Sequence, residues 1–335
     1  MSITPRIDQI DLNYLINGGF RYWQRAGIAS PVNTTTSFAY SAADRWLHRH
    51  TGTFTGTPNV QRTNSTLPTN GFSQFALTHT FRRNAAAATM EHQQRIESIF
   101  SRKLVAAGKM SLSLFVNASL TTGSIRVRAS FPTAADNHAS QTEFYNSGLI
   151  AVSSASTWQE ITLENIDVNS NCVNGMAIFI EYSLPSGTDG ADQTIRLTQV
   201  TLNSGRKASN FTPSGGDAFS EEYYCQKYFY KTYPIDTALN VDQGAGISSW
   251  SGASSALSNG AFNHSLEYGV RMRAIPTVTV YNPRSGTGTA RMSNDSGNTT
   301  VNIALSSNSR VNLQFPSAVG ITTYFFHVAA DAEIT

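Results

Sequence analysis

The sequence predicts an all-β protein with two antiparallel, jelly-roll-like β-sandwich domains joined by a short aromatic helix. Charged residues make up only 14% of the chain, against about 25% in an average globular protein. Ser, Thr, Asn and Gly take their place, and these residues favour pleated strands and tight turns. Short apolar runs also alternate with turn-forming residues along most of the chain. A length of 335 residues fits two domains, although one large β domain would also fit.

A docking or extension segment is predicted at residues 1–13, and a jelly-roll domain at 14–208. Apolar and polar residues alternate clearly in five segments of this domain, which are 109–120, 123–131, 157–168, 176–184 and 193–205. Such alternation is typical of antiparallel sheets with one face on the core and one in water. These segments are therefore predicted strands.

One segment of this domain has a different pattern. Residues 89–104, TMEHQQRIESIFSRKL, carry Met90, Ile96, Ile99 and Phe100 at irregular spacing. A full helix, a single helical turn and a covering loop all fit this spacing.

A linker and a short helix are predicted at 209–226. Either Asp217 or Ser220 suits the helix N-cap, and two glutamates follow at the positive end of the helix dipole. The aromatic stretch SEEYYCQKYFYKTYP, residues 220–234, then becomes strand-like from Tyr228.

The second sandwich is predicted at 227–335. Its predicted strands are 261–270, 277–283, 299–306, 310–315 and 322–334. Two low-charge stretches, 242–260 and 282–297, are predicted to be long loops. Loops of that length in a compact domain are usually functional or disordered.

Several function classes lack support in the sequence. A net charge of +2 offers no basic surface for nucleic acid or an anionic membrane. No apolar run approaches the roughly 20 residues of a membrane helix. The first residues lack the pattern of a secretory signal, so we expect any extracellular role to be reached without a cleaved leader, for example as part of an assembled particle. Cys172 and Cys225 are expected to be buried free thiols.

No catalytic motif or cofactor fingerprint is present. His48 and His50 would share one face of a strand, but a metal site would need a third ligand from elsewhere. The few scattered acidic residues define no glycosidase pair. The sequence therefore predicts no catalytic residue, no metal, no cofactor and no enzymatic activity.

Sugar binding suits a sandwich of this composition, because aromatic faces and uncharged hydrogen-bonding groups are the chemistry that a sugar needs. Three tryptophans, Trp23, Trp46 and Trp158, lie beside predicted strands and are expected to pack. Trp250 lies among small polar residues and is the best candidate for an exposed ring. The predicted ligand-binding residues are Trp250, Asn263, His264, Tyr268, Tyr281 and Arg284, with core packing as the alternative for His264, Tyr268 and Tyr281.

Ordered motifs resemble a recurrent family of bacteriophage virion proteins. The stretches NYLINGGFRYWQRAG (13–27) and YSAADRWLHR (40–49) resemble the family's opening. WQEITLENI and TIRLTQVTLNSG resemble the closing strands of a jelly roll similar to family-4/9-type carbohydrate-binding modules. EEYYCQKYFYKTY resembles the element that precedes a C-terminal β tip in such fibres.

The resemblance implies a non-enzymatic phage fibre or tip protein, or a fibre-like bacterial adhesin, that binds a cell-surface glycan. A purely structural virion component and a polysaccharide depolymerase are the alternatives. Such fibres are homotrimers, which implies that Tyr223, Tyr224 and Tyr228 form a trimer joint, with intrachain packing as the alternative. Residues 1–13 would dock to other fibre or virion proteins. The location implied is a tail or head fibre, or a bacterial surface fibre. The last jelly-roll strand has no carboxylate, so calcium is not expected.

Overall fold

The computed structural model describes residues 13–27, 31–152, 155–242, 245, 247–251, 262–284, 289–292, 298–315 and 323–334. The chain forms two compact units. Unit 1 comprises Met1–Arg21, Ala29–Tyr224 and Ile334–Thr335, and unit 2 comprises Tyr22–Ile28 and Cys225–Glu333. The predicted division had kept 209–226 as a separate segment. In the structure the boundary falls inside a helix, between Tyr224 and Cys225.

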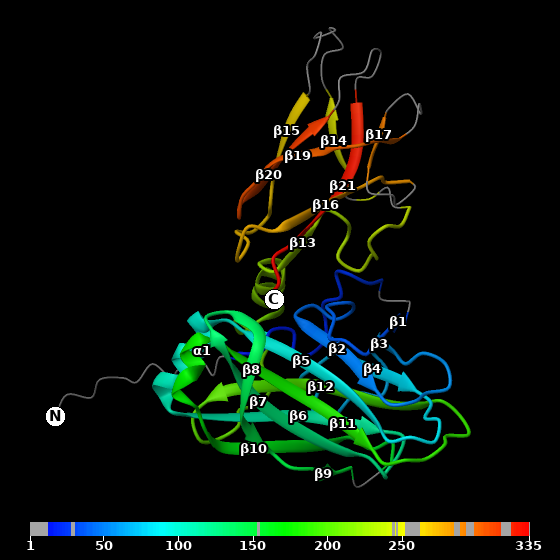
Figure 1. The fold of residues 1–335 in the computed structure, drawn as a ribbon, viewed down its shortest axis with the longest axis vertical. Coiled ribbons are helices and arrows are strands. Elements are labelled where there is room, and N and C mark those ends of the chain that lie inside the picture. The colour runs from blue at the N-terminus through cyan, green and yellow to red at the C-terminus, as the bar shows by residue number, and fades with distance from the viewer. Residues whose placement is uncertain are drawn as a thin grey trace, which may run out of the picture. The chain divides into compact units, whose positions relative to one another are not determined.

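Unit 1 contains two antiparallel sheets (Figure 1). The first has the order β1 (Val32–Asn33), β3 (Asn59–Thr63), β4 (Ala76–Phe81), β12 (Gln193–Ser204), β6 (Lys109–Ala118), β10 (Gln159–Asp167). The second has the order β2 (Trp46–Thr51), β5 (Ala88–Ile96), β11 (Met176–Leu184), β7 (Ser124–Ala134), β8 (Asn137–Asn146), with β9 (Ile150–Ala151) beside β7. All five strands predicted from alternation are present. The all-β sandwich prediction is confirmed.

The segment 89–104 is divided between two elements. Its first part is the strand β5, which pairs with β2 on one side and β11 on the other. The helix α1 (Ser98–Ala107) follows and ends at Gly108, which has a φ of 71° and donates its N–H to Leu104 and Val105. Pairing on both edges thus decides the state of β5, because the local spacing alone favours neither helix nor strand. A 3-10 turn, η1 (Ser170–Asn174), precedes β11.

The two sheets of unit 1 pack face to face. The Phe81 ring of β4 lies 6.3 Å from the Tyr182 ring of β11, and the His79 ring of β4 lies 5.4 Å from the His92 ring of β5. Leucine, isoleucine and valine side chains from both sheets fill the remaining space. This packing buries the apolar faces of β6, β7, β11 and β12, as alternation predicts.

Three histidines, His48, His79 and His92, lie in this core with 1% or less of their surface exposed. His48 Nδ1 and His92 Nδ1 are 2.8 Å apart and share a hydrogen bond. Burial lowers the pKa of His92 to about 3, and it lowers the pKa values of His48 and His79 well below 6.5. The core therefore holds all three rings in the neutral form.

Unit 2 is also an antiparallel sandwich. β21 (Thr323–Asp331) pairs with β13 (Phe229–Lys231), β14 (Ser248–Ser251), β16 (Thr277–Tyr281) and β17 (Ala290–Met292), and β17 pairs with β18 (Asn298–Thr299). A second sheet has the order β15 (Phe262–Glu267), β20 (Arg310–Phe315), β19 (Asn302–Ser306). Val311, Leu313 and Phe315 from β20 and Phe326 from β21 share one core, which joins the two sheets.

An N-terminal segment belongs to unit 2, which the sequence had not indicated. Gln24 donates its amide to the carbonyl of Phe229 at 3.0 Å. The Arg25 guanidinium lies 3.9 Å from the centre of the Phe229 ring and pairs with Asp331 and Glu333. A guanidinium held by two carboxylates and a ring fixes this segment beside β13 and β21.

The helix α2 (Ala218–Gln226) confirms the predicted short helix. Asp217 is the residue that caps it, since its Oδ1 accepts from Ser220 N at 2.8 Å. Glu221 in the first turn is buried, and its Oε1 accepts from the backbone N–H groups of Asn17 and Ser214.

Both cysteines are free and buried, as predicted. Burial raises the pKa of the Cys172 thiol to about 12, so this residue is unreactive at neutral pH. Among the described residues, no helix is both long and apolar enough to cross a membrane.

Acid should destabilise the protein through the three core histidines. The unfolded chain takes up their protons near pH 6.5, whereas the folded chain resists until far lower pH. Each neutral core histidine should lower the free energy of unfolding by about 1.4 kcal/mol per pH unit below 6.5. We expect urea unfolding between pH 6.5 and 4 to show a shallower pH slope for His79→Gln than for wild type. Equal slopes would contradict this account, whatever the stability of the variant at pH 8.

Candidate functional site

A groove on unit 1 has the lining expected of a ligand site. It has a volume of about 380 Å³, within the range of about 300–1,000 Å³ for ligand pockets. Its lining residues are aromatic, hydroxyl-bearing, amide-bearing or aliphatic, and are Leu67, Pro68, Thr69, Asn70, Phe115, Ser156, Thr157 and Trp158. No residue of this described lining is ionisable. The groove therefore suits a neutral, hydroxylated ligand.

Trp158 provides one aromatic face of the groove. It directly precedes β10, and its side chain is only partly buried. The indole Nε1 donates to the carbonyl of Thr66 at 2.8 Å, which fixes the ring against the loop over 64–75. Phe115, a partly exposed residue of β6, contributes the second ring. Two aromatic rings thus line one open groove.

Asn70, which lines the groove, is held by a pair of amide hydrogen bonds. Asn70 donates to Gln199 Oε1 at 2.8 Å, and Gln199 donates to Asn70 Oδ1 at 2.7 Å. Gln199 lies where the register of β12 shifts between Thr198 and Thr201, and its φ is 54°. The bulge turns a buried amide out of the ladder toward the loop. The loop is therefore attached to unit 1 both at Thr66 and at Asn70.

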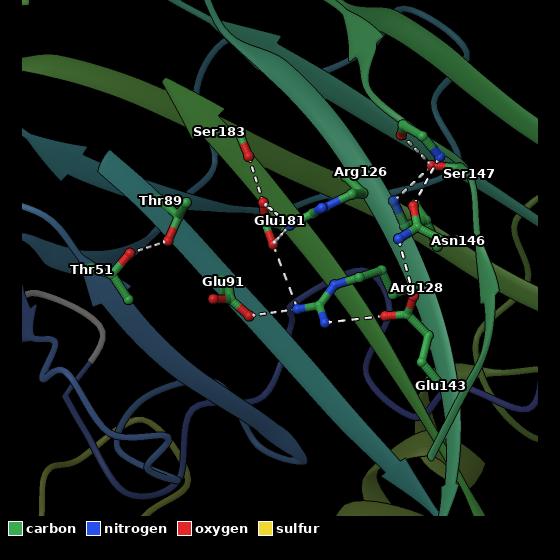
Figure 2. Close-up of polar contacts among 12 residues, drawn as sticks. Thr51, Thr89, Glu91, Arg126, Arg128, Glu143, Asn146, Ser147, Glu181 and Ser183 are labelled. Carbon is green, nitrogen blue, oxygen red and sulfur yellow. Dashed lines mark hydrogen bonds and ion pairs between the residues drawn. The ribbon is translucent and has the colours of Figure 1, made fainter. Parts of the chain in front are cut away.

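A polar network covers another face of unit 1 (Figure 2). Arg49, Glu91, Glu181 and Arg126 occupy directly opposite positions on β2, β5, β11 and β7. Arg49 and Arg126 each lie 2.7 Å from a glutamate oxygen. Arg128 bridges the two glutamates at 2.9 and 3.5 Å, as the dashed lines in Figure 2 show. The sequence had offered no pair of carboxylates, and register alone brings Glu91 and Glu181 together.

This carboxylate pair has the surroundings of a structural network. A glycosidase acid must hold a proton near neutral pH, which requires a raised pKa. Burial raises the pKa of Glu181, but hydrogen bonds from Arg126 and Ser183 outweigh it, so the pKa is lowered overall. The arginine contacts therefore favour the carboxylate form of Glu181, which does not suit this residue to donate a proton.

The histidines predicted not to bind metal form no such site in the part of the chain that the structure describes. There, no group of three or more His, Cys, Asp or Glu residues is arranged for a metal ion. His48 faces the core, and His50 Nδ1 lies 2.8 Å from the Thr34 hydroxyl.

The residues predicted to bind ligand in unit 2 come from both of its sheets. Asn263 and His264 belong to β15 of the three-stranded sheet, whereas Tyr281 ends β16 in the other sheet. Arg284 is exposed just beyond Tyr281. Tyr268 is only 7% exposed, and its ring lies 5.5 Å from Tyr230. Core packing, the alternative for Tyr268, therefore describes it better than ligand binding.

His264 and Tyr281 are half-buried. The His264 ring makes an edge contact with Phe326 at 5.7 Å, and Tyr281 makes one with Tyr233 at 5.9 Å. Asn263 is exposed and lies opposite Gln314, which in turn lies opposite Asn302. An amide row thus crosses the three-stranded sheet.

The two predicted loops contain strands. Residues 248–251 form β14, so the Trp250 backbone pairs with Tyr324 of β21 and is not in a loop. Residues 290–292 form β17. The predictions of continuous loops over 242–260 and 282–297 are wrong at these positions, because both segments add to the long strand β21. Residues 252–260, 285–288 and 293–297 lie outside the described residues.

The tyrosines of the predicted trimer joint differ in their exposure. Tyr228 is 1% exposed within the single chain, so it has no surface left to bury against another copy. Its proposed trimer contact is therefore a wrong prediction. Tyr223 is 44% exposed, and its ring makes an edge contact with Tyr224 at 6.1 Å.

Sequence reasoning assigned Trp158 to packing and missed the groove. A usable signal was present, because Trp158 follows the small polar run SSAST, just as Trp250 follows ISS. Trp23 and Trp46 are fully buried, as expected. Trp158, in contrast, meets residues that are distant along the sequence, such as Thr66 and Phe115.

Comparisons with known proteins gave structural likenesses only. No family model matches the chain, and no curated protein matches it. A carbohydrate-binding module of the β-sandwich superfamily, described as promiscuous in specificity, has a TM-score of 0.36 and 11% identity, covering 51% of this chain and 62% of its own. The enzymatically active domain of bacteriophage CBA120 tailspike protein 4 has a TM-score of 0.35 and 15% identity, and the match covers 57% of this chain and 21% of the tailspike chain.

The C-terminal family 22 carbohydrate-binding module of Clostridium thermocellum Xyn10B has a TM-score of 0.31 and 13% identity, covering 53% of this chain and 99% of its own. This chain thus spans less than two thirds of the first two structures. TM-scores this low carry no argument about function, and the β-sandwich class rests on the strands described above.

The amide pair should be necessary for the stability of the groove wall. The substitution Asn70→Ala leaves the buried Gln199 amide without its partner, and an unsatisfied buried group typically costs about 1–3 kcal/mol of stability. We expect the free energy of unfolding to fall by that amount in chemical denaturation. Asn64→Ala, an exposed position of the same loop, is the control and should be neutral. Equal losses in both variants would contradict the role of the pair.

Proposed function

We propose that this chain is a non-enzymatic carbohydrate-binding protein of the phage fibre or fibre-like adhesin type, and that its ligand is a cell-surface glycan. The observation that carries the proposal is the groove between Trp158, Phe115 and the loop over 67–70. The apolar face of a pyranose packs on an aromatic ring, and its hydroxyl groups need uncharged donors and acceptors. Both kinds of group line this groove.

The contacts of the groove wall favour a preformed site. Trp158 is held by its bond to Thr66, and Asn70 is held by Gln199. Side chains ordered before binding lose less entropy when the ligand arrives. A shallow groove of this size still suggests modest affinity for one copy, so repeated copies in a fibre would raise the effective affinity.

The fibre assignment rests on the ordered motifs at 13–27, 40–49 and 221–233. We propose a homotrimer in a tail or head fibre, or at a bacterial surface, with residues 1–13 docking to other fibre or virion proteins. The exposed Asn263 and Arg284 of unit 2 would offer further contacts to the same target surface. No cofactor takes part in this function.

Loss of the Trp158 ring should remove glycan binding. We expect Trp158→Ala to weaken binding on a glycan array, or to purified host polysaccharide in calorimetry, at least about tenfold, equal to about 1.4 kcal/mol. Trp158→Phe should keep part of the affinity, because it retains an aromatic face. Leu149→Ala removes a 64% exposed side chain elsewhere on unit 1 and serves as the control. A reducing-end assay with the same polysaccharide should show no turnover.

Two results would contradict this function. One is a wild-type protein that binds no glycan on a broad array. The other is undiminished binding by Trp158→Ala, which would move the site away from the groove.

The trimer can be tested separately. We expect light scattering at micromolar concentration to give a mass near three times the 36.3 kDa of one chain. Tyr223→Ser should shift the mass toward that of one chain, because Tyr223 has accessible surface to bury at an interface. A wild-type mass of one chain would refute the trimer.

A further inference from the structure

A second pocket of unit 1 is lined by the same loop as the groove. It has a volume of about 180 Å³. Residues 71–75 line it, whereas residues 67–70 line the Trp158 groove. Asn70 and Gly71 are consecutive, so the two linings adjoin along the loop. One extended ligand could therefore contact both.

The second pocket is again aromatic. Phe72, Phe75 and Phe211 contribute its rings. Phe72 is 49% exposed, whereas Phe211 is only 9% exposed. The Arg62 guanidinium stacks over the Phe75 ring at 4.4 Å. Phe72 thus offers the exposed aromatic surface on which a second sugar could pack.

The charge of this pocket distinguishes it from the groove. Arg21 lines it and is exposed, and its Nη1 lies 3.3 Å from Gln74 Oε1. Arg62 donates to the backbone carbonyl of Arg21, which brings a second cation close by.

The acidic residue of the pocket faces away from solvent. Glu221 is 2% exposed, and its Oε1 accepts from the N–H groups of Asn17 and Ser214. Burial raises the pKa of Glu221 to about 7, so its negative charge is incomplete at neutral pH. Arg21 is thus the exposed charged residue of the pocket lining.

We propose that the groove and the second pocket are two subsites for one linear acidic oligosaccharide. This inference rests on the proposed function and names its ligand class. A neutral sugar would pack on Trp158, and the chain would cross the loop at Asn70 and Gly71. A sugar with a carboxylate, such as a uronic acid, would lie over Phe72 with its carboxylate on Arg21. A guanidinium recognises a carboxylate through charge-assisted hydrogen bonds.

The test compares a panel of linear oligosaccharides that contain uronic acid with the same compounds after reduction of the carboxyl group to an alcohol. We expect wild type to bind at least one acidic member about tenfold more tightly than its reduced form. Arg21→Gln should bind both forms with the affinity that wild type shows for the reduced form. Arg102→Gln removes one exposed arginine from α1 and should behave as wild type.

The outcomes distinguish failure of this inference from failure of the proposed function. Trp158→Ala should lose binding of both the acidic and the reduced oligosaccharides. Phe72→Ala should weaken the binding of tetrasaccharides but not that of the disaccharide that fits the groove. Retained binding of the reduced form by Arg21→Gln shows that this variant is folded. Equal affinity of wild type for both forms would overturn the acidic subsite and leave glycan binding intact. Failure of wild type to bind neutral and acidic glycans alike would overturn the proposed function itself.

Discussion

The Gln199 amide is the constraint on which the candidate site depends. A bulge in β12 places this buried side chain outside the regular ladder, where it needs a partner for both its donor and its acceptor. Asn70 supplies both, and in doing so attaches the loop that separates the two pockets. The same two hydrogen bonds thus satisfy the buried Gln199 amide and fix the loop that shapes the candidate binding surface.

Two other sets of buried polar residues in unit 1 differ in their surroundings. Arg49, Arg126 and Arg128 lie within ion-pair distance of Glu91 and Glu181. The core histidines give up their charge, because apolar packing surrounds them.

The two pockets differ in charge while they share aromatic character. A carbohydrate ligand can satisfy both through one chemistry, in which rings stack and polar groups select. In our proposal the lining of the groove would select uncharged hydroxyl groups, and Arg21 would select a carboxylate. Specificity for a particular glycan would then come from the order of sugars along the chain, with affinity supplied by repeated copies.

The sequence by itself determined the all-β class, five strands of the first sandwich, the short helix near residue 220 and both buried cysteines. Period-2 alternation and turn-forming residues are local features of the sequence. The alternation recurs wherever a strand buries one face against the core. Tertiary structure alone decided that β5 is a strand, that Trp250 lies in β14, that Tyr228 is internal, and that Glu91 faces Glu181. It also decided the site, because Trp158, Phe115 and Asn70 meet only through strand pairing and a bulge, which join residues that are distant along the chain.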